Sequence, residues 1–157
     1  MQCKFKVFIL IVVSIVSIHT ISCSNQNNFV HVVIQTELGD IEVAIDSVNA
    51  PNTSVNFLKY VDEGFYSTGS FYRTVKLDNQ PDNDVWIEVI QGGINREYRD
   101  KQFPPINLER TNQTHVKHED GAISMARSGP DTATSAFFIC IGNQPSLDFG
   151  GDRNPDG

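Results

Sequence analysis

The fold of this chain is decided by two neighbouring runs, Gly121-Ala122-Ile123-Ser124-Met125-Ala126 and Ala136-Phe137-Phe138-Ile139-Cys140-Ile141. Each run is short and apolar, with β-branched or aromatic residues and turn formers at its ends, which is typical of a β-strand. The segment between them, Arg127–Ser135, includes Ser128-Gly129-Pro130 and is rich in turn formers. We therefore predict two strands joined by a loop.

Side chains alternate between the two faces of a strand, so the second run predicts two different surfaces. Phe137, Ile139 and Ile141 share one face, whereas Phe138 and Cys140 share the other. If the first set fills the core, Phe138 points away from it. An outward Phe is unfavourable unless it lines a pocket or lies under a helix or loop, and the alternation leaves both alternatives open.

The chain before these runs predicts more short strands and one helix. Alternating apolar residues in 29–46, with a turn at Leu38-Gly39-Asp40, indicate a β-hairpin. A helix is predicted from Pro51 to Gly64, with Asn49 as a possible cap. The remaining predicted elements are strands at Ser70–Val75 and Val85–Ile90, a loop at Lys76–Asp84 and an irregular stretch at Asn95–Asp120. This pattern predicts a mainly β fold, a closed barrel with a helix over its end.

The first 22 residues predict a signal peptide. Lys4 and Lys6 precede the apolar run Val7–Ile18, which is too short to cross a bilayer of about 30 Å. Thr20-Ile21-Ser22-Cys23 resembles a bacterial lipobox and predicts lipidation of Cys23; a plain cleaved signal and an uncleaved anchor are the alternatives. We expect a signal at 1–22, a tether at 23–29 and one domain at 30–157. The protein would then be exported and held at the cell envelope, on its periplasmic or outer surface.

Charge and cysteine content exclude two classes of protein. The net charge is −7, and loss of Lys4 and Lys6 with the signal would make it −9, so little would neutralise the phosphates of a nucleic acid. Three cysteines do not form a disulfide framework, and Cys140 lies in an apolar run that predicts a buried thiol.

Several short motifs resemble the cyclophilin family and follow the order in which that family carries them. They are Phe71-Tyr72-Arg73, Gln91-Gly92-Gly93, the run Gly121–Ala126, Ser128-Gly129-Pro130 with the run Ser135–Cys140, and Leu147-Asp148. The resemblance extends from about Val30 to the end of the chain. It implies an eight-stranded antiparallel barrel with capping helices and an active site on its outer surface. Because family members continue after the Leu-Asp motif, it also implies that this chain is a fragment lacking the closing strands and helix.

The resemblance implies a peptidyl-prolyl cis-trans isomerase that uses neither a metal nor another cofactor. Rotation about a peptide bond costs about 18–20 kcal/mol, and a fixed guanidinium can favour the twisted imide. That guanidinium would be Arg73. The implied substrate-binding residues are Phe138, Gln91, Leu147, Ala126, Tyr72 and Val89. The partners would be proline-containing segments of exported client proteins, with membrane contact only through the lipid and with the protein itself a monomer.

Some positions depart from the family pattern. Tyr72 stands where His is usual, Ala136 where Gln is common, and Ser146 where many members carry a Trp. Between Arg73 and Gln91 lie 17 residues, a longer segment than in compact members. The pocket Phe of the family therefore falls near Ile87 or Glu88, with Trp86 as an alternative, and the pocket His has no clear counterpart. We expect weak activity and poor cyclosporin affinity.

Two rival functions remain open. One is a non-catalytic cyclophilin-like module that binds proline-containing peptides as a chaperone or scaffold. The other is a lipid-anchored β-barrel that carries a small ligand, which would leave the motifs around Arg73 and Gln91 unexplained. A calcium loop at 152–157 and a metal site at His115 and His118 are weaker alternatives.

Overall fold

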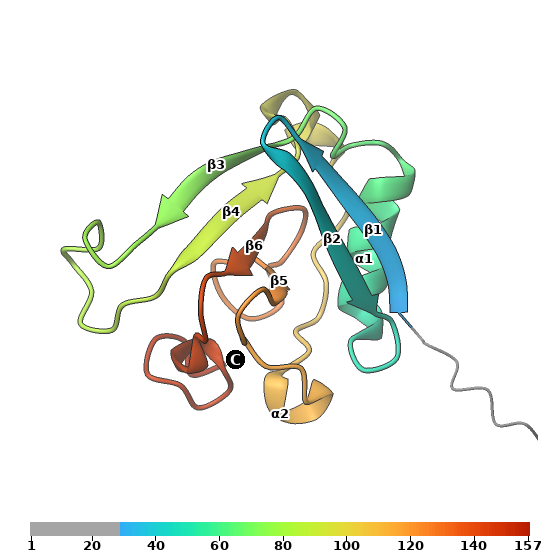
Figure 1. The fold of residues 1–157 in the computed structure, drawn as a ribbon. Helices are drawn as coiled ribbons and strands as arrows, with labels where there is room; N and C mark the ends of the chain where they lie inside the picture. Colours follow the sequence, from blue (N-terminus) through green and yellow to red (C-terminus); the bar gives the residue numbers. More distant parts are fainter. Residues whose placement is uncertain (1–28) are drawn as a thin grey trace, which may run out of the picture.

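A computed structural model describes residues 29–157 as a mainly β protein with antiparallel sheets and few helices (Figure 1). The strands are β1 (Phe29–Thr36), β2 (Gly39–Asp46), β3 (Ser70–Val75), β4 (Val89–Gly93), β5 (Ile123–Met125) and β6 (Phe137–Cys140). The helices are α1 (Pro51–Asp62), α2 (Thr111–Thr114) and the 3-10 turns η1 (Arg96–Lys101) and η2 (Pro145–Leu147). Within residues 29–157, no helix is long and apolar enough to cross a membrane.

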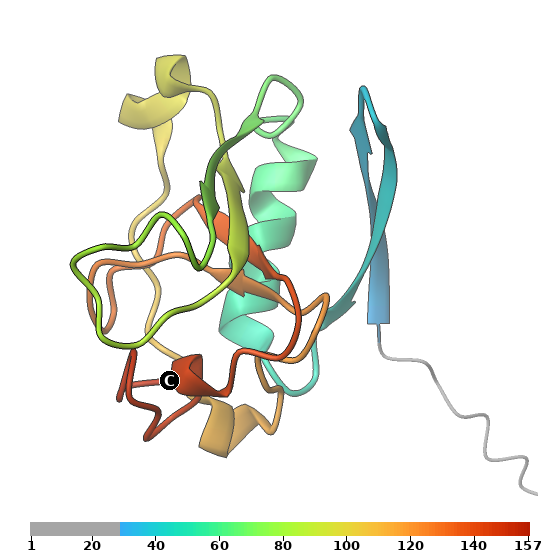
Figure 2. The ribbon, with the colours of Figure 1, turned by 60° about the vertical axis from the view of Figure 1, so that its left-hand side comes forward.

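The six strands form two separate sheets. Strands β1 and β2 make a hairpin, and the larger sheet has the order β3-β4-β6-β5. Figure 2 shows the hairpin standing apart from the larger sheet, on the far side of α1 in that view. The mainly β class predicted from the sequence is confirmed, whereas the described residues do not close the eight-stranded barrel that the resemblance implies.

Helix α1 begins at Pro51, as predicted, but its N-terminus is capped from elsewhere in the chain. The side chain of Asn49 does not cap it, because its amide donates to Asp46 Oδ2 at 2.7 Å. Instead the carboxylate of Glu109 accepts hydrogen bonds of 2.9 and 2.8 Å from the backbone amides of the two residues after Pro51. The helix buries Phe57 together with Tyr60, which is fully buried, against the core.

The larger sheet is apolar on both faces, as the alternation in β6 predicts. One face packs Phe137 and Met125 against Phe57 of α1 and Val43 of β2 in the main core. The other face forms a second, smaller cluster. It comprises Val75, Val89, Cys140 and Leu147, with Ile87, Ala122 and Phe138 packed against them. Phe138 therefore points away from the main core, and Cys140 is a buried free thiol.

Strand β3 has its predicted bounds, but β4 starts four residues later than expected. The reason is the side chain of Gln80, which is buried and pairs with both ends of the β3–β4 loop. Its amide nitrogen donates to the carbonyls of Lys76 (2.7 Å) and Ile87 (2.8 Å), and its oxygen accepts from the amide of Ile87 (3.3 Å). Residues 85–88, predicted as strand, therefore belong to the loop.

Candidate functional site

A row of four side chains crosses the larger sheet. Arg73 on β3 pairs with Gln91 on β4, which pairs with Phe138 on β6, which pairs with Ser124 on β5. Residues directly opposite each other on neighbouring strands present their side chains on the same face. Four strands thus bring a cation, an amide, an aromatic ring and a hydroxyl onto one surface.

A β-bulge at Tyr72 gives Arg73 its place in this row. Phe71 pairs with Gly92 and Arg73 pairs with Gln91, so Tyr72 is the additional residue of β3. A bulge of this kind reverses the alternation of the residues after it. Phe71 consequently packs against the main core, whereas Arg73 emerges on the opposite face.

Gln91 orients the guanidinium of Arg73. Arg73 Nη1 donates to Gln91 Oε1 at 3.3 Å, and Gln91 Nε2 donates to the hydroxyl of Tyr72 at 3.1 Å. Among residues 29–157, no carboxylate lies within ion-pair distance of Arg73. The guanidinium therefore keeps its charge uncompensated at short range, and only a neutral amide fixes its direction.

A cavity of about 620 Å³ lies over this face of the sheet. Six of the site residues predicted from the sequence line it, namely Arg73, Val89, Gln91, Ala126, Phe138 and Leu147. Tyr72 does not line it: its side chain points outward, 55% exposed, and reaches the site only through its contact with Gln91. Cys23 lies outside the described residues.

The β3–β4 loop contributes Ile87 to the cavity. Ile87 lines the cavity and packs against the second cluster, next to Val89. Trp86, the alternative filler suggested by the sequence, is 55% exposed and donates its indole N–H to the carbonyl of Asn83 at 2.7 Å. Of these two candidates, Ile87 is therefore the one that supplies apolar surface near Phe138.

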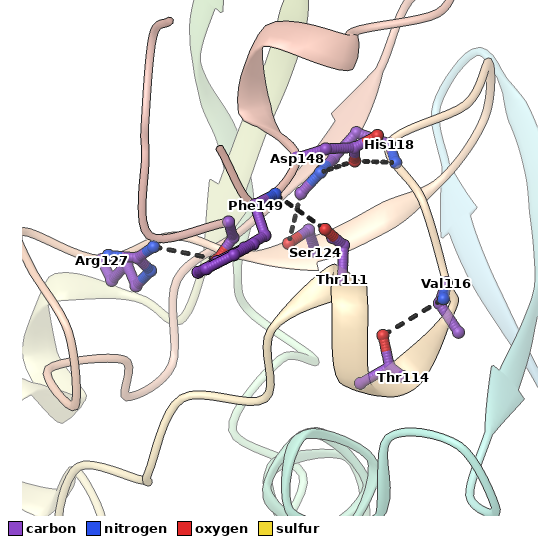
Figure 3. A network of polar contacts seen from close by, with 9 residues as sticks. Thr111, Thr114, Val116, His118, Ser124, Arg127, Asp148 and Phe149 are labelled. Carbon is purple, nitrogen blue, oxygen red and sulfur yellow. Dashed lines mark hydrogen bonds and ion pairs between the residues drawn. The ribbon is translucent and has the colours of Figure 1, made fainter. Parts of the chain in front are cut away.

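The sequence does not reveal a buried histidine behind the aromatic ring. His118 stacks on Phe138, with ring centroids 5.8 Å apart and planes 12° apart. Its Nδ1 lies 3.0 Å from Asp148 Oδ1 and its Nε2 lies 3.2 Å from Ser124 Oγ (Figure 3). Burial lowers the pKa of His118, and the nearby Asp148 opposes this shift only in part.

His115 and His118, the candidate metal ligands, do not form a metal site. His115 ends α2 in a left-handed conformation (φ 60°), while His118 turns toward Asp148. Within the part of the chain that the structure describes, no group of three or more His, Cys, Asp or Glu side chains could hold a metal ion. The position of His118 could not be read from the sequence because its partners follow it by 6 and 30 residues.

A family model and a curated relative both match this chain to peptidyl-prolyl cis-trans isomerases. The family model described as cyclophilin type peptidyl-prolyl cis-trans isomerase matches residues 31–151. Peptidyl-prolyl cis-trans isomerase A of Dickeya dadantii is 36% identical over 122 residues, which are 76% of this chain but only 58% of that relative's length.

Solved structures agree with this match. A crystal structure of a Cryptosporidium parvum cyclophilin type peptidyl-prolyl cis-trans isomerase superposes with a TM-score of 0.61 and 26% identity, covering 76% of this chain and 72% of that one. A second structure of that protein, in the presence of the dipeptide Ala-Pro, gives a TM-score of 0.60 and 25% identity, covering 75% and 72%.

Proposed function

The chain belongs to the cyclophilin-type peptidyl-prolyl cis-trans isomerase family, and we propose that it catalyses rotation about X-Pro peptide bonds. The observation that carries the proposal is the placement of Arg73 and Phe138 on one face of the larger sheet, over a common cavity. A cation beside an aromatic and aliphatic pocket is what this reaction requires.

The reaction needs a donor and not a nucleophile. The partial double bond of the X-Pro amide resists rotation by about 18–20 kcal/mol. At the half-rotated geometry, resonance is broken and the proline nitrogen recovers a lone pair. The Arg73 guanidinium, fixed by Gln91, would donate to that nitrogen only in the twisted state, and such differential binding lowers the barrier.

The proline ring would sit against Phe138, with Leu147, Val89 and Ile87 completing an apolar seat. These side chains form one cluster, so the seat is held in place by packing on the sheet. The amide nitrogen of Ala126 already donates to the carbonyl of Ala136 at 2.8 Å. A backbone contact of Ala126 with a bound peptide would therefore use its carbonyl oxygen.

We also propose the cellular setting that the first residues predict. Lipidation of Cys23 would tether the domain at the cell envelope, where exported proteins fold and where X-Pro isomerisation, which takes tens of seconds or longer, limits folding. The clients would be proline-containing segments of those proteins. The two sheets would be parts of an eight-stranded barrel, as the likeness to solved cyclophilins supports.

An isomerisation assay with an Ala-Pro-containing peptide tests the proposal. We expect the protein to accelerate cis-trans exchange and Arg73→Ala to lower kcat/KM by about 10²-fold or more, the usual cost of removing a transition-state donor. Arg96→Ala is the matched control, because Arg96 is exposed on η1 and does not line the cavity.

Peptide affinity distinguishes the non-catalytic alternative. If the protein binds the peptide but does not accelerate exchange, it is a proline-peptide binding module. If Arg73→Ala and the unchanged protein have equal rates, the role of Arg73 is refuted.

A further inference from the structure

Three polar side chains form a connected group directly behind Phe138. The group, which we call the His118 relay, consists of His118, Ser124 and Asp148 (Figure 3). Its members come from the segment after α2, from β5 and from the end of η2. Among the described residues, no buried side-chain nitrogen or oxygen lacks a partner, so the relay is fully satisfied.

The contacts define the protonation of the imidazole. A carboxylate can only accept, so Nδ1 of His118 carries the proton and donates to Asp148 Oδ1 at 3.0 Å. The same oxygen accepts from the backbone amide of His118, also at 3.0 Å. With Nδ1 protonated and the ring neutral, Nε2 is an acceptor, and the hydroxyl of Ser124 donates to it. The two hydrogen bonds fix both the tautomer and the plane of the ring.

The imidazole ring of His118 packs flat against the ring of Phe138. The two rings are nearly parallel, at 12°, and His118 is 9% exposed, so the imidazole is a buried support under one side of the phenyl ring. Ser124 is the cross-strand partner of Phe138, so the relay also ties the imidazole to the strand next to the ring. Any rotation of His118 about its side-chain bonds would break a hydrogen bond at each end.

We propose that His118 is a positioning residue that sets the orientation of Phe138 and thereby shapes the seat for the proline ring. This proposal rests on the proposed function. The relay resembles in composition the Ser-His-Asp groups of hydrolases, but rotation about an X-Pro bond forms and breaks no covalent bond and needs no activated serine. The role of the relay is therefore to hold the ring of Phe138 in place in the cavity wall.

Two variants separate the hydrogen bonds from the ring stacking. His118→Phe keeps an aromatic ring against Phe138 but removes both side-chain hydrogen bonds, and Ser124→Ala removes only the contact at Nε2. His31→Phe is the control, since His31 is an exposed histidine of the hairpin that also contacts a carboxylate, Glu42, at 2.8 Å. Thermal unfolding identifies any variant that does not fold, and Ser124→Ala then carries the test, because it deletes a single partly buried hydroxyl.

The readouts are the NMR signals of the Phe138 ring, the Kd for an Ala-Pro-containing peptide, and kcat. We expect both variants to shift or broaden the Phe138 signals and to weaken peptide binding by about tenfold, while kcat falls less than in Arg73→Ala because the guanidinium donor is untouched. A purely structural role would lower the melting temperature without moving Kd in the folded protein.

The proposal is overturned if folded His118→Phe and Ser124→Ala keep the Phe138 signals and the peptide Kd of the unchanged protein. The ring signals and the Kd do not depend on turnover. If the unchanged protein binds the peptide without isomerising it, the proposed enzyme function fails, yet the same shifts in Kd and Phe138 would still support positioning by His118.

Discussion

Gln91 contacts both residues that the bulge places opposite it, Tyr72 and Arg73. Gln91→Ala would leave the guanidinium of Arg73 without its side-chain partner, so the donor would lose its fixed direction but keep its charge. We expect kcat/KM for an X-Pro peptide to fall by about five- to tenfold, which corresponds to the loss of one ordinary hydrogen bond of about 1 kcal/mol.

The fall should be smaller than that of Arg73→Ala, and the double variant should be no worse than Arg73→Ala alone, because both changes act on the same donor. Gln35→Ala, on an exposed position of β1, is the control for a glutamine removed elsewhere. Equal activity of Gln91→Ala and the unchanged protein would mean that Arg73 is oriented by the bound peptide.

His118 makes stability depend on pH in a defined window. Burial is the main cause of its lowered pKa; the charge of Arg127 adds to the shift, and Asp148 opposes it. The unfolded chain therefore binds a proton at a higher pH than the folded one does. The free energy of unfolding is fully retained above the ordinary pKa of 6.5 and falls as the pH drops below that value.

Urea unfolding between pH 7.5 and pH 5 measures this loss, at pH values above those at which ordinary carboxylates titrate. In His118→Gln the slope should be shallower than in the unchanged protein. Identical slopes in the two proteins would contradict the assignment.

At the scale of single elements, β3 shows how one additional residue serves two surfaces. In a regular strand Phe71 and Arg73 would lie on the same face. Phe71 could then not pack into the main core while Arg73 faces the cavity. The bulge at Tyr72 separates them. Nothing in the composition of Ser70–Val75 distinguishes a bulged from a regular strand, since the extra residue is defined only by its pairing with Gln91.

Helix α1 depends on a residue more than fifty positions away. Glu109 accepts hydrogen bonds from two free amides of the first turn, where its negative charge also faces the positive end of the helix. Glu109→Ala should lower the free energy of unfolding by about 1–2 kcal/mol, as measured by urea denaturation.

Glu63→Ala provides the matched control at the other end of α1, where Glu63 is exposed and its backbone amide donates to the carbonyl of Lys59 at 3.1 Å. Glu109→Gln should keep one of the acceptors and lose less than the alanine variant. A loss no larger for Glu109→Ala than for Glu63→Ala would show that water caps the first turn equally well.

At the scale of the whole molecule, the local sequence pattern predicted the strands and the helix, whereas tertiary contacts decided where β4 starts, how α1 is capped and where His118 lies. The alternation in Phe137–Cys140 correctly gave both faces of β6, and the hairpin predicted in 29–46 is formed by β1 and β2. The late start of β4, the Glu109 cap and the His118 relay all rest on partners distant in the sequence. Periodicity carries no information about such pairs.

The hairpin is the least supported part of the described fold. It pairs with no other strand among residues 29–157, and a second cavity of about 610 Å³ lies between β2 and β5. Isolated two-stranded hairpins are marginal in water. Amides of β1 and β2 should therefore exchange with deuterium faster than those of β4 and β6, by about tenfold or more, as in local opening of a weakly supported segment.

Native-state hydrogen exchange read by mass spectrometry tests this expectation, with the β4 and β6 amides as the internal reference. Equal protection of the hairpin and the larger sheet would mean that other residues of the protein cover β2. In that case the second cavity would be filled in solution.

The pairing of Gln80 with Lys76 and Ile87 closes the β3–β4 loop at its base. Beyond that closure the chain runs through exposed residues such as Pro81 and Asp82. Lengthening a loop costs little when its ends are already held together. A tag or fluorescent reporter spliced between Pro81 and Asp82 would accordingly leave Arg73 and Gln91 in register, which gives engineers a permissive splice point beside the cavity.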